Sequence, residues 1–394
     1  MGKYFLKKRI FALIFIISVF GYAAVNAYNA HEKLINSWND IENESITDKV
    51  VAVEADINEE IYGKDNFIET FSYMNKLMGK HEINEFEFIK DKKGYLLYSS
   101  FFRENTEEEF EYALRIKNLK YKASEYGAET IFIMPPDKYI PSVTEVYEGM
   151  PINNVNHKTD ELLMWLYRFG VNTIDYREYL PNANISYDET FYKTDHHWTI
   201  LASFEASKIL IDELNKKFGA ELNIADESIY DFKQFSESMI GSISRRVGIN
   251  FSGVDDFTAI IPNCDNEYNY SFINLTNEII VKEGATKETI IKEDVLDDEL
   301  NDKYDTYLGG MHYYDSITNL SNKEGPTALF IRDSYASPMI TFLAPLFSKI
   351  DAVWCLEDIE ELDIEVIVEN NVYDYIIIQV YPYNIKDEAF NYYK

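Results

Sequence analysis

Five short apolar runs recur between residues 130 and 379, separated by stretches with helical periodicity. Strands that are buried on both faces of a sheet are continuously apolar, whereas the helices that connect them are amphipathic. The runs cover residues 130–134, 171–175, 327–331, 352–354 and 375–379. The stripe of one such helix consists of Ile200, Phe204, Ser207, Ile211, Leu214 and Phe218. The pattern therefore predicts an α/β fold with a parallel central sheet.

Two stretches depart from this rhythm. Residues 29–84 are acidic, and helical spacing predicts a stalk or lid there, on the evidence of Phe67, Phe71, Met74 and Leu77. Residues 220–308 are rich in Asn and Asp and contain short alternating runs, which predicts a β-rich insertion in the α/β domain of residues 85–394. Insertions at this edge of an α/β sheet commonly shape a ligand cleft, so we expect the insertion to wall one side of a groove.

The N-terminus has the features of a targeting segment. An apolar run at residues 10–25 follows a basic flank made of Lys3, Lys7, Lys8 and Arg9. Residues 1–28 are therefore expected to be a signal anchor or a signal peptide. Cleavage after Ala27 is conceivable but poorly specified, and an uncleaved anchor is slightly favoured. The basic flank should stay inside, which places the rest outside the cytoplasm, anchored to the cell membrane or secreted if cleaved.

Composition narrows the range of partners. The 394-residue chain has a formal net charge of −31, which would repel nucleic acid and anionic lipid surfaces. Its two cysteines, Cys264 and Cys355, lie far apart without zinc-site spacing, so a disulfide and two free thiols both remain open. No metal or cofactor is expected.

The segment Asp195-His196-His197-Trp198-Thr199 is the first candidate for chemistry. In extended chain Asp195 and His197 point to the same side, so a carboxylate can orient an imidazole and support its charged form. An isolated Asp-x-His is more often a helix entry in which the histidines cap or stack. A nucleophile elsewhere in the chain is needed to decide between the two interpretations.

Ser334 supplies that candidate nucleophile. It directly follows the apolar run at 327–331 and precedes a helical pattern, the position of the nucleophile in α/β hydrolase-type sites. There the start of a helix can help to bind an oxyanion. The alternative is that Ser334 or Asp333 merely caps the helix.

Together these residues resemble the DHHW family of low-GC Gram-positive bacteria. That family is related to the SGNH hydrolase-like, AlgX/AlgJ-like proteins that O-acetylate alginate and other exopolysaccharides. Three further segments support the resemblance, namely residues 241–248 (GSISRRVG), 308–310 (LGG) and 342–345 (FLAP). The resemblance covers roughly residues 95–381 and implies an SGNH-like three-layer sandwich with a parallel central sheet and a β-rich insertion.

The resemblance also implies roles for individual residues. Ser334 would be the nucleophile, His197 the general base and Asp195 its orienting carboxylate, while His196 would be structural and Trp198 would serve packing. Two features differ from the SGNH pattern, because Arg332 replaces the glycine of the nucleophile block and no Gly-x-Asn-Asp block is recognisable. Candidate oxyanion or substrate contacts are the Ser334 amide, Tyr335, Arg332, Gln379 and His196.

Three functions remain open on this basis. The first is an extracytoplasmic O-acetyltransferase that acts on a cell-surface or secreted polysaccharide through an acyl-serine, with a membrane-bound O-acyltransferase as acyl donor. The second is a carbohydrate esterase of the same fold, and the third is a catalytically inactive glycan-binding or scaffold protein of the envelope. The strongly acidic chain fits a polyanionic acceptor poorly, so we expect a neutral or amino-sugar glycan.

Overall fold

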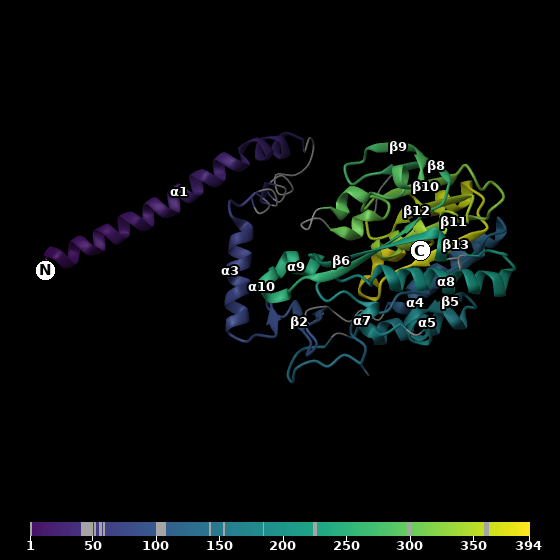
Figure 1. The fold of residues 1–394 in the computed structure, drawn as a ribbon, viewed down its shortest axis with the longest axis horizontal. Helices are drawn as coiled ribbons and strands as arrows, with labels where there is room; N and C mark the ends of the chain where they lie inside the picture. Colours follow the sequence, from purple (N-terminus) through teal and green to yellow (C-terminus); the bar gives the residue numbers. More distant parts are fainter. Residues whose placement is uncertain are drawn as a thin grey trace. The chain divides into compact units, whose positions relative to one another are not determined.

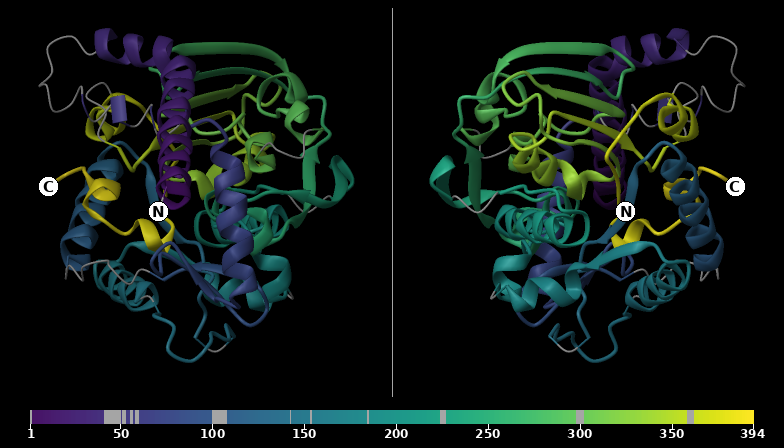
Figure 2. Two further views of the ribbon diagram at one scale, coloured as in Figure 1. Left: turned by 90° about the vertical axis from the view of Figure 1, so that its left-hand side faces the viewer. Right: turned by 90° about the vertical axis from the view of Figure 1, so that its right-hand side faces the viewer.

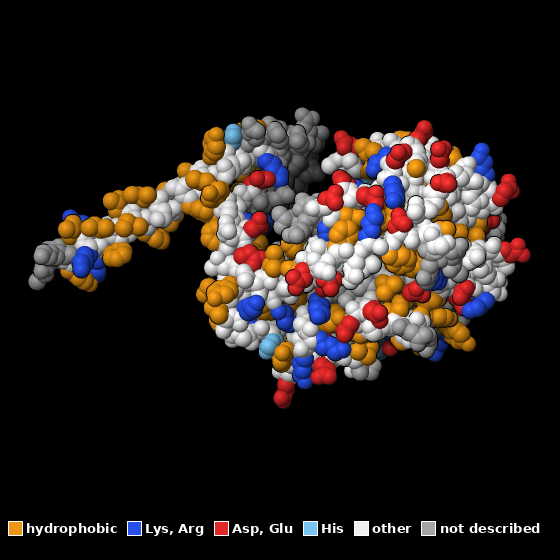
Figure 3. Space-filling model, in the orientation of Figure 1, with side chains coloured by type: hydrophobic (Ala, Val, Ile, Leu, Met, Phe, Trp, Pro, Cys, Tyr) orange, Lys and Arg blue, Asp and Glu red, His pale blue; other side chains and the backbone are white. Residues whose placement is uncertain are grey.

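The computed structural model describes residues 2–40, 50, 53–54, 57, 60–99, 108–141, 143–152, 154–183, 185–223, 227–297, 302–357 and 362–394. It divides into two compact units, residues 1–74 and 75–394. The first unit contains helix α1 (Gly2–Asp40), whose segment Tyr4–His31 has a mean hydropathy of 2.2 and is long and apolar enough to cross a membrane. Figure 3 shows apolar side chains along this helix, as expected for a signal anchor. Helix α3 (Lys64–Leu77) crosses the boundary between the units in sequence.

The second unit is built on an eight-stranded sheet with the order β5-β4-β13-β11-β12-β10-β8-β9 (Figure 1). Its first five strands are parallel, and each predicted apolar run forms one of them. These strands are β4 (Glu129–Met134), β5 (Asn172–Asp175), β11 (Thr327–Arg332), β12 (Lys349–Trp354) and β13 (Tyr375–Gln379). The predicted α/β class with a parallel core is therefore confirmed.

The other three strands are antiparallel neighbours that lengthen the sheet (Figure 2). They are β8 (Glu267–Ile273), β9 (Ile279–Ala285) and β10 (Tyr314–Asn319). The predicted parallel sheet is thus extended by an antiparallel part. Strands β8 and β10 alternate buried and less buried positions, and β9 has no fully buried residue, so they lack the continuous apolar runs of the core strands. The segment expected as an insertion thus contributes two strands to the central sheet itself.

Helices cover both faces of the parallel core, giving three layers. One apolar cluster unites this sheet with α4 (Glu109–Glu125), α5 (Val155–Arg168) and α13 (Ile364–Asn370). A larger cluster unites the opposite face with α8 (Ile200–Phe218) and α12 (Ser337–Leu343). Helix α8 begins at the N-cap Thr199 and ends at Gly219, whose φ of 68° suits glycine. Cys264 and Cys355 are free thiols.

Shorter elements surround this core. A three-stranded sheet consists of β1 (Glu82–Ile83), β2 (Phe88–Lys90) and β3 (Leu96–Tyr98), and a separate hairpin consists of β6 (Tyr230–Met239) and β7 (Asp255–Pro262). The short α-helices are α6 (Tyr176–Asn182), α7 (Tyr187–Thr190), α9 (Ser242–Val247), α10 (Ile249–Ser252) and α11 (Thr286–Thr289). The 3-10 turns are η1 (Glu227–Ile229), η2 (Glu293–Leu296), η3 (Lys303–Thr306), η4 (Ser334–Ala336), η5 (Pro382–Asn384) and η6 (Asp387–Phe390).

Because β4, β11 and β13 are adjacent and parallel, the segments that follow them emerge at the same edge of the sheet. Ligand and catalytic sites of open α/β sheets form at this carboxyl edge. Here the edge brings together three segments that lie far apart in the sequence: residues 135–138, 333–337 and 380–384.

Candidate active site

Ser334 is the first residue of η4 and follows β11 after Asp333, at the end of a core strand as the sequence predicts. The cap of this turn is Asp333, whose carboxylate accepts hydrogen bonds from Tyr335 N at 3.1 Å, Tyr381 N at 2.6 Å and Asn384 Nδ2 at 2.9 Å. The alternative in which Ser334 itself caps the helix therefore does not apply, and its hydroxyl is left for another partner.

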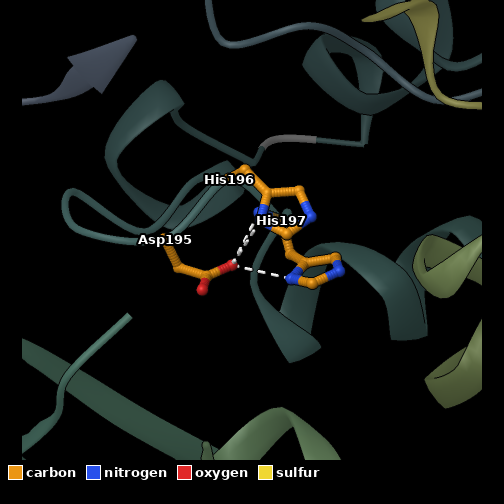
Figure 4. Close-up of side chains that lie close together, drawn as sticks. All are labelled: Asp195, His196 and His197. Atoms are coloured by element: carbon orange, nitrogen blue, oxygen red, sulfur yellow. Dashed lines mark hydrogen bonds and ion pairs between the residues drawn. The ribbon is translucent and has the colours of Figure 1, made fainter. Parts of the chain in front are cut away.

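That partner is His197, from the loop that precedes α8. A β-bridge between Phe191 and Trp198 closes the loop. His197 Nε2 lies 2.7 Å from Ser334 Oγ. On its other side, His197 Nδ1 lies 2.7 Å from Asp195 Oδ1, and Figure 4 shows this pair together with His196. Asp195 Oδ1 also accepts the backbone amide of His197 at 2.8 Å. The structure thus aligns serine, histidine and aspartate in the order that a nucleophile, its base and an orienting group require.

The glycine-serine segment that supported the resemblance lies against the carboxylate of this array. Ser242 N donates to Asp195 Oδ2 at 2.6 Å, and Gly241 N donates to Thr194 Oγ1 at 3.1 Å. A Cβ on Gly241 would lie 2.5 Å from Asp195 Cβ and from its backbone nitrogen. Only glycine allows so close an approach, which gives a physical reason for its presence.

The electrostatics of the array favour a charge on the histidine. Burial alone would favour neutral groups, yet the charge and hydrogen bond of His197 hold the pKa of Asp195 well below its usual range. In return Asp195, aided by the carboxylates of Asp302 and Asp333, raises the pKa of His197 above its ordinary value against the effect of burial. For His196 burial and the neighbouring His197 lower the pKa, so this second histidine is neutral at pH 7.

A pocket of about 320 Å³ opens beside Ser334 and His197. The residues that line it come from segments before and after Ser334 in the sequence. They include Asp302, Tyr304, Asp305, Trp354 and Asn384. Asp302, Tyr304 and Asp305 belong to the end of the predicted insertion, which therefore walls part of the groove. A larger cavity of about 500 Å³ lies beside Lys193 and Asp255 and has none of the three aligned residues in its walls.

The other candidate contacts occupy different places. His196 borders the pocket, but its Nδ1 is 2.7 Å from Ser242 Oγ and its ring lies against that of His197. Tyr335 is buried and its hydroxyl donates to the backbone carbonyl of His196. Arg332 is fully buried and its Nη2 forms an ion pair with Asp315 at 2.5 Å.

Gln379 is buried as well, and its side-chain amide has no hydrogen-bond partner among the described residues. Neither Gln379, Arg332 nor Tyr335 borders the pocket. Their side chains are therefore poor candidates for direct oxyanion contacts. Trp198 is fully buried, and its Nε1 donates to Tyr304 Oη and to the carbonyl of Tyr335, in line with a packing role.

Three pocket residues carried no recognisable signal in the sequence. Tyr304 stacks on the His197 ring with centroids 4.0 Å apart and an interplanar angle of 11°. Asp302 and Asn384 also border the pocket. Asp302 and Tyr304 belong to the short turn η3 and its cap, and Asn384 ends η5. These turns are distant from Ser334 and His197 in the sequence and too short for periodicity to reveal them.

The same geometry bears on metal binding. Asp195, His196 and His197 bring three potential ligand atoms within 4.8 Å of one another. However, both oxygens of Asp195 and both ring nitrogens of His197 are already hydrogen-bonded within the protein. A metal ion bound through His197 would have to break its contact with either Asp195 or Ser334, so the residues fit a hydrogen-bonded array better than a metal centre.

Fold and site together define a class: a three-layer α/β domain with a serine at the carboxyl end of a core strand, paired with a histidine and an aspartate. Comparison with known families names it. Residues 90–248 match the family model described as "SGNH hydrolase-like domain, acetyltransferase AlgX", so the chain carries an SGNH hydrolase-like domain. No curated protein sequence matches the chain.

Solved structures with this fold include PatB1 of Bacillus cereus and a DHHW family protein of Eubacterium siraeum. PatB1 with a sulfonyl adduct has 17% identity and a TM-score of 0.64, covering 79% of this chain and 100% of its own. PatB1 without that adduct has 16% identity and a TM-score of 0.63, with coverages of 77% and 99%. The DHHW family protein has 17% identity and a TM-score of 0.56, with coverages of 77% and 94%. At these identities the likeness establishes the fold, and the expected SGNH-like architecture is confirmed.

Proposed function

We propose that this chain is an extracytoplasmic O-acetyltransferase that acts on a polysaccharide through an acyl-serine intermediate. The observation that carries the proposal is the unbroken hydrogen-bond array from Ser334 through His197 to Asp195, whose first two members line the pocket. The AlgX acetyltransferase description of the matched family model supports acyl transfer as the reaction type.

In the first half-reaction Ser334 Oγ attacks the carbonyl carbon of the acyl donor and passes its proton to His197 Nε2. The donor's leaving oxygen then takes that proton as its bond to the acyl carbon breaks. In the second half a sugar hydroxyl gives its proton to His197 and attacks the acyl-serine, and Ser334 recovers a proton from His197 as it leaves. Asp195 holds the imidazole in the tautomer with Nε2 free and stabilises the imidazolium.

The tetrahedral intermediate needs donors for its negative oxygen. We assign this role to the Ser334 amide and to Asn384, which borders the pocket and whose Nδ2 is held by Asp333. Donors fixed in advance around such an oxygen commonly supply a large part of the rate acceleration.

The charge of the pocket bears on the acceptor. Asp302 and Asp305 stand in its walls, and the described residues that line it include no lysine or arginine. A uronate polymer would be repelled, which supports a neutral or amino-sugar glycan as acceptor. Figure 3 shows further acidic side chains spread over the visible face of the protein. The apolar helix α1 supports anchoring to the cell membrane, where a membrane-bound O-acyltransferase can serve as the donor.

The test is turnover of an activated ester, p-nitrophenyl acetate, by the protein without the apolar segment of α1. Ser334→Ala and His197→Ala should each lower kcat by several orders of magnitude, roughly 10³ to 10⁶-fold, because the nucleophile or its base is lost. The control variants Ser124→Ala and His157→Ala remove exposed residues on α4 and α5 and should leave kcat unchanged. A sulfonyl fluoride should modify Ser334 in the active protein, as intact-mass and peptide mass spectrometry would show. Folded protein with no turnover and no labelling that depends on Ser334 would contradict the proposal.

Transfer and hydrolysis are separated by adding an acceptor. Chito-oligosaccharides should become O-acetylated at the expense of free acetate, while an esterase would release acetate with no acetylated sugar. Oligomers of a uronic acid should be poor acceptors. Mass spectrometry of the sugar products distinguishes these outcomes.

A further inference from the structure

The loop that follows β4 contacts both halves of the proposed catalytic array. The strand ends at Pro135-Pro136, and the next two residues, Asp137 and Lys138, are each only 3% exposed. Lys138 Nζ donates to the backbone carbonyl of Asp195 at 2.7 Å and to that of Lys193 at 3.3 Å. A buried ammonium is thus attached directly to the segment that carries the aspartate and histidine.

Asp137 points to the serine half. Its Oδ2 accepts a hydrogen bond from the Tyr381 hydroxyl at 2.7 Å, and the Tyr381 ring stacks on Tyr335 with centroids 4.4 Å apart and an angle of 12°. Tyr335 directly follows Ser334. The backbone nitrogen of Tyr381 also donates to Asp333 at 2.6 Å. One residue pair therefore reaches the histidine loop through its lysine and the serine turn through its aspartate.

The burial of a lysine at this place has an electrostatic cost that the mere filling of space does not explain. Burial lowers the pKa of Lys138 to about 8, an effect that the nearby carboxylates of Asp255, Asp195, Asp137 and Asp91 oppose. A well-packed apolar side chain would commonly fill such a site at lower cost. What an apolar side chain cannot do is hold two backbone carbonyls of one loop at a fixed place.

We propose that Asp137 and Lys138 are a positioning pair that sets the relative placement of His197 and Ser334. The inference rests on the proposed acyl transfer, which needs reacting atoms within a few tenths of an ångström of a productive arrangement. Neither residue borders the pocket beside Ser334, so both act through the residues they hold.

The test compares Lys138→Met with Lys158→Met, which removes another largely buried lysine, on α5, away from the array. Lys138→Met should lower kcat by about 10 to 100-fold with little change in KM, because a small misplacement affects the reacting geometry more than binding. Lys158→Met should leave kcat unchanged. The low-field proton resonance of the hydrogen bond between Asp195 and His197 should shift or broaden in Lys138→Met alone.

The hydrogen bond between Tyr381 and Asp137 provides a milder variant. Tyr381→Phe removes one oxygen atom and should also lower kcat. If the contacts of Lys138 and of Asp137 maintain the same geometry, kcat of the double variant Lys138→Met/Tyr381→Phe should fall by less than the product of the two single factors. Should Lys138→Met fail to fold, Tyr381→Phe carries the test. A folded variant with wild-type kcat and an unchanged resonance would overturn the inference. A variant in which KM rises while kcat stays at the wild-type value would overturn it as well. The resonance is read without turnover, so this inference can fail independently of the proposed acetyltransferase activity.

Discussion

His197 is held between an aromatic ring and several carboxylates. Tyr304 covers one face of the imidazole, and Asp195 binds its Nδ1. Asp302 and Asp333 add negative potential near the ring, and together with Asp195 they raise the pKa of His197 against the effect of burial. Such an environment suits a residue that must accept a proton during the reaction and hold the resulting charge briefly.

The raised pKa determines the acid limb of the pH profile. His197 acts as a base only when neutral, so kcat/KM should rise with pH through a midpoint above the ordinary histidine value of about 6.5. Asp302→Asn removes a carboxylate that favours the protonated ring, so the midpoint should move to lower pH, on the order of half a unit. The control Asp265→Asn changes an exposed carboxylate outside the pocket and should leave the midpoint in place. A midpoint that does not move in Asp302→Asn would show that this carboxylate does not act on His197.

A second prediction for a single residue concerns Gly241, which lies against Asp195. In Gly241→Ala the new Cβ would meet backbone atoms of Thr194 and Asp195 at 2.5 Å, and backbone atoms cannot move aside cheaply. The displaced Asp195 should cost about 10²-fold in kcat, together with a lower Tm. Ester turnover and thermal unfolding of the same sample check both effects. Wild-type kcat in folded Gly241→Ala would mean that Asp195 tolerates the shift.

Among the elements, α8 connects the histidine loop to the core. Thr199 caps its first turn by accepting a hydrogen bond from Ala202 N at 3.1 Å, only two residues after His197. Its apolar face is buried in the same cluster as α12, which follows the serine turn. The two helices therefore hold the two halves of the site on a shared layer of the fold.

Thr199→Ala should lower the free energy of unfolding by about 1 kcal/mol through loss of the cap, and it should lower kcat as well because the frayed turn adjoins His197. The matched control is Asp363→Ala, which removes the cap of α13 on the opposite face of the sheet. It should cost similar stability and leave kcat unchanged. Denaturant unfolding and ester turnover should be measured for both variants. Equal effects of the two substitutions on kcat would contradict the role of α8 in holding the histidine loop.

At the scale of the whole molecule, the apolar clusters of the α/β unit lie entirely within residues 75–394. A chain that begins at Asn75 should therefore fold alone, melt cooperatively and keep Ser334-dependent ester turnover. Calorimetry and sulfonyl fluoride labelling of this fragment provide the measurement. Aggregation of the fragment, or folding without labelling, would show that residues 1–74 contribute to the site.

The accuracy of the sequence predictions differed between parts of the fold. Each core strand and the two motifs around His197 and Ser334 could be located, because continuous apolar runs and short chemical motifs are local signals. Strands β8, β9 and β10 were not assigned to the central sheet, since partial exposure removes that signal. The structure places Arg332, Tyr335 and Gln379 outside the walls of the pocket, which the sequence could not show because position next to a motif does not reveal on which side of the backbone a cavity forms.

The sequence by itself determined the α/β class, the apolar N-terminal segment, and the residue types that can serve as nucleophile, base and orienting acid. Only the tertiary structure decided that Asp333 rather than Ser334 caps the turn, that Gly241 and Ser242 support Asp195, and that Asp137 and Lys138 join the two halves of the site. The physical reason is the range of the interactions. Apolar periodicity is set by neighbours along the chain. The hydrogen bonds from Ser242 to Asp195, from Lys138 to Asp195 and from Tyr381 to Asp137 instead join residues from segments 47 to 244 positions apart, brought together at one edge of the sheet.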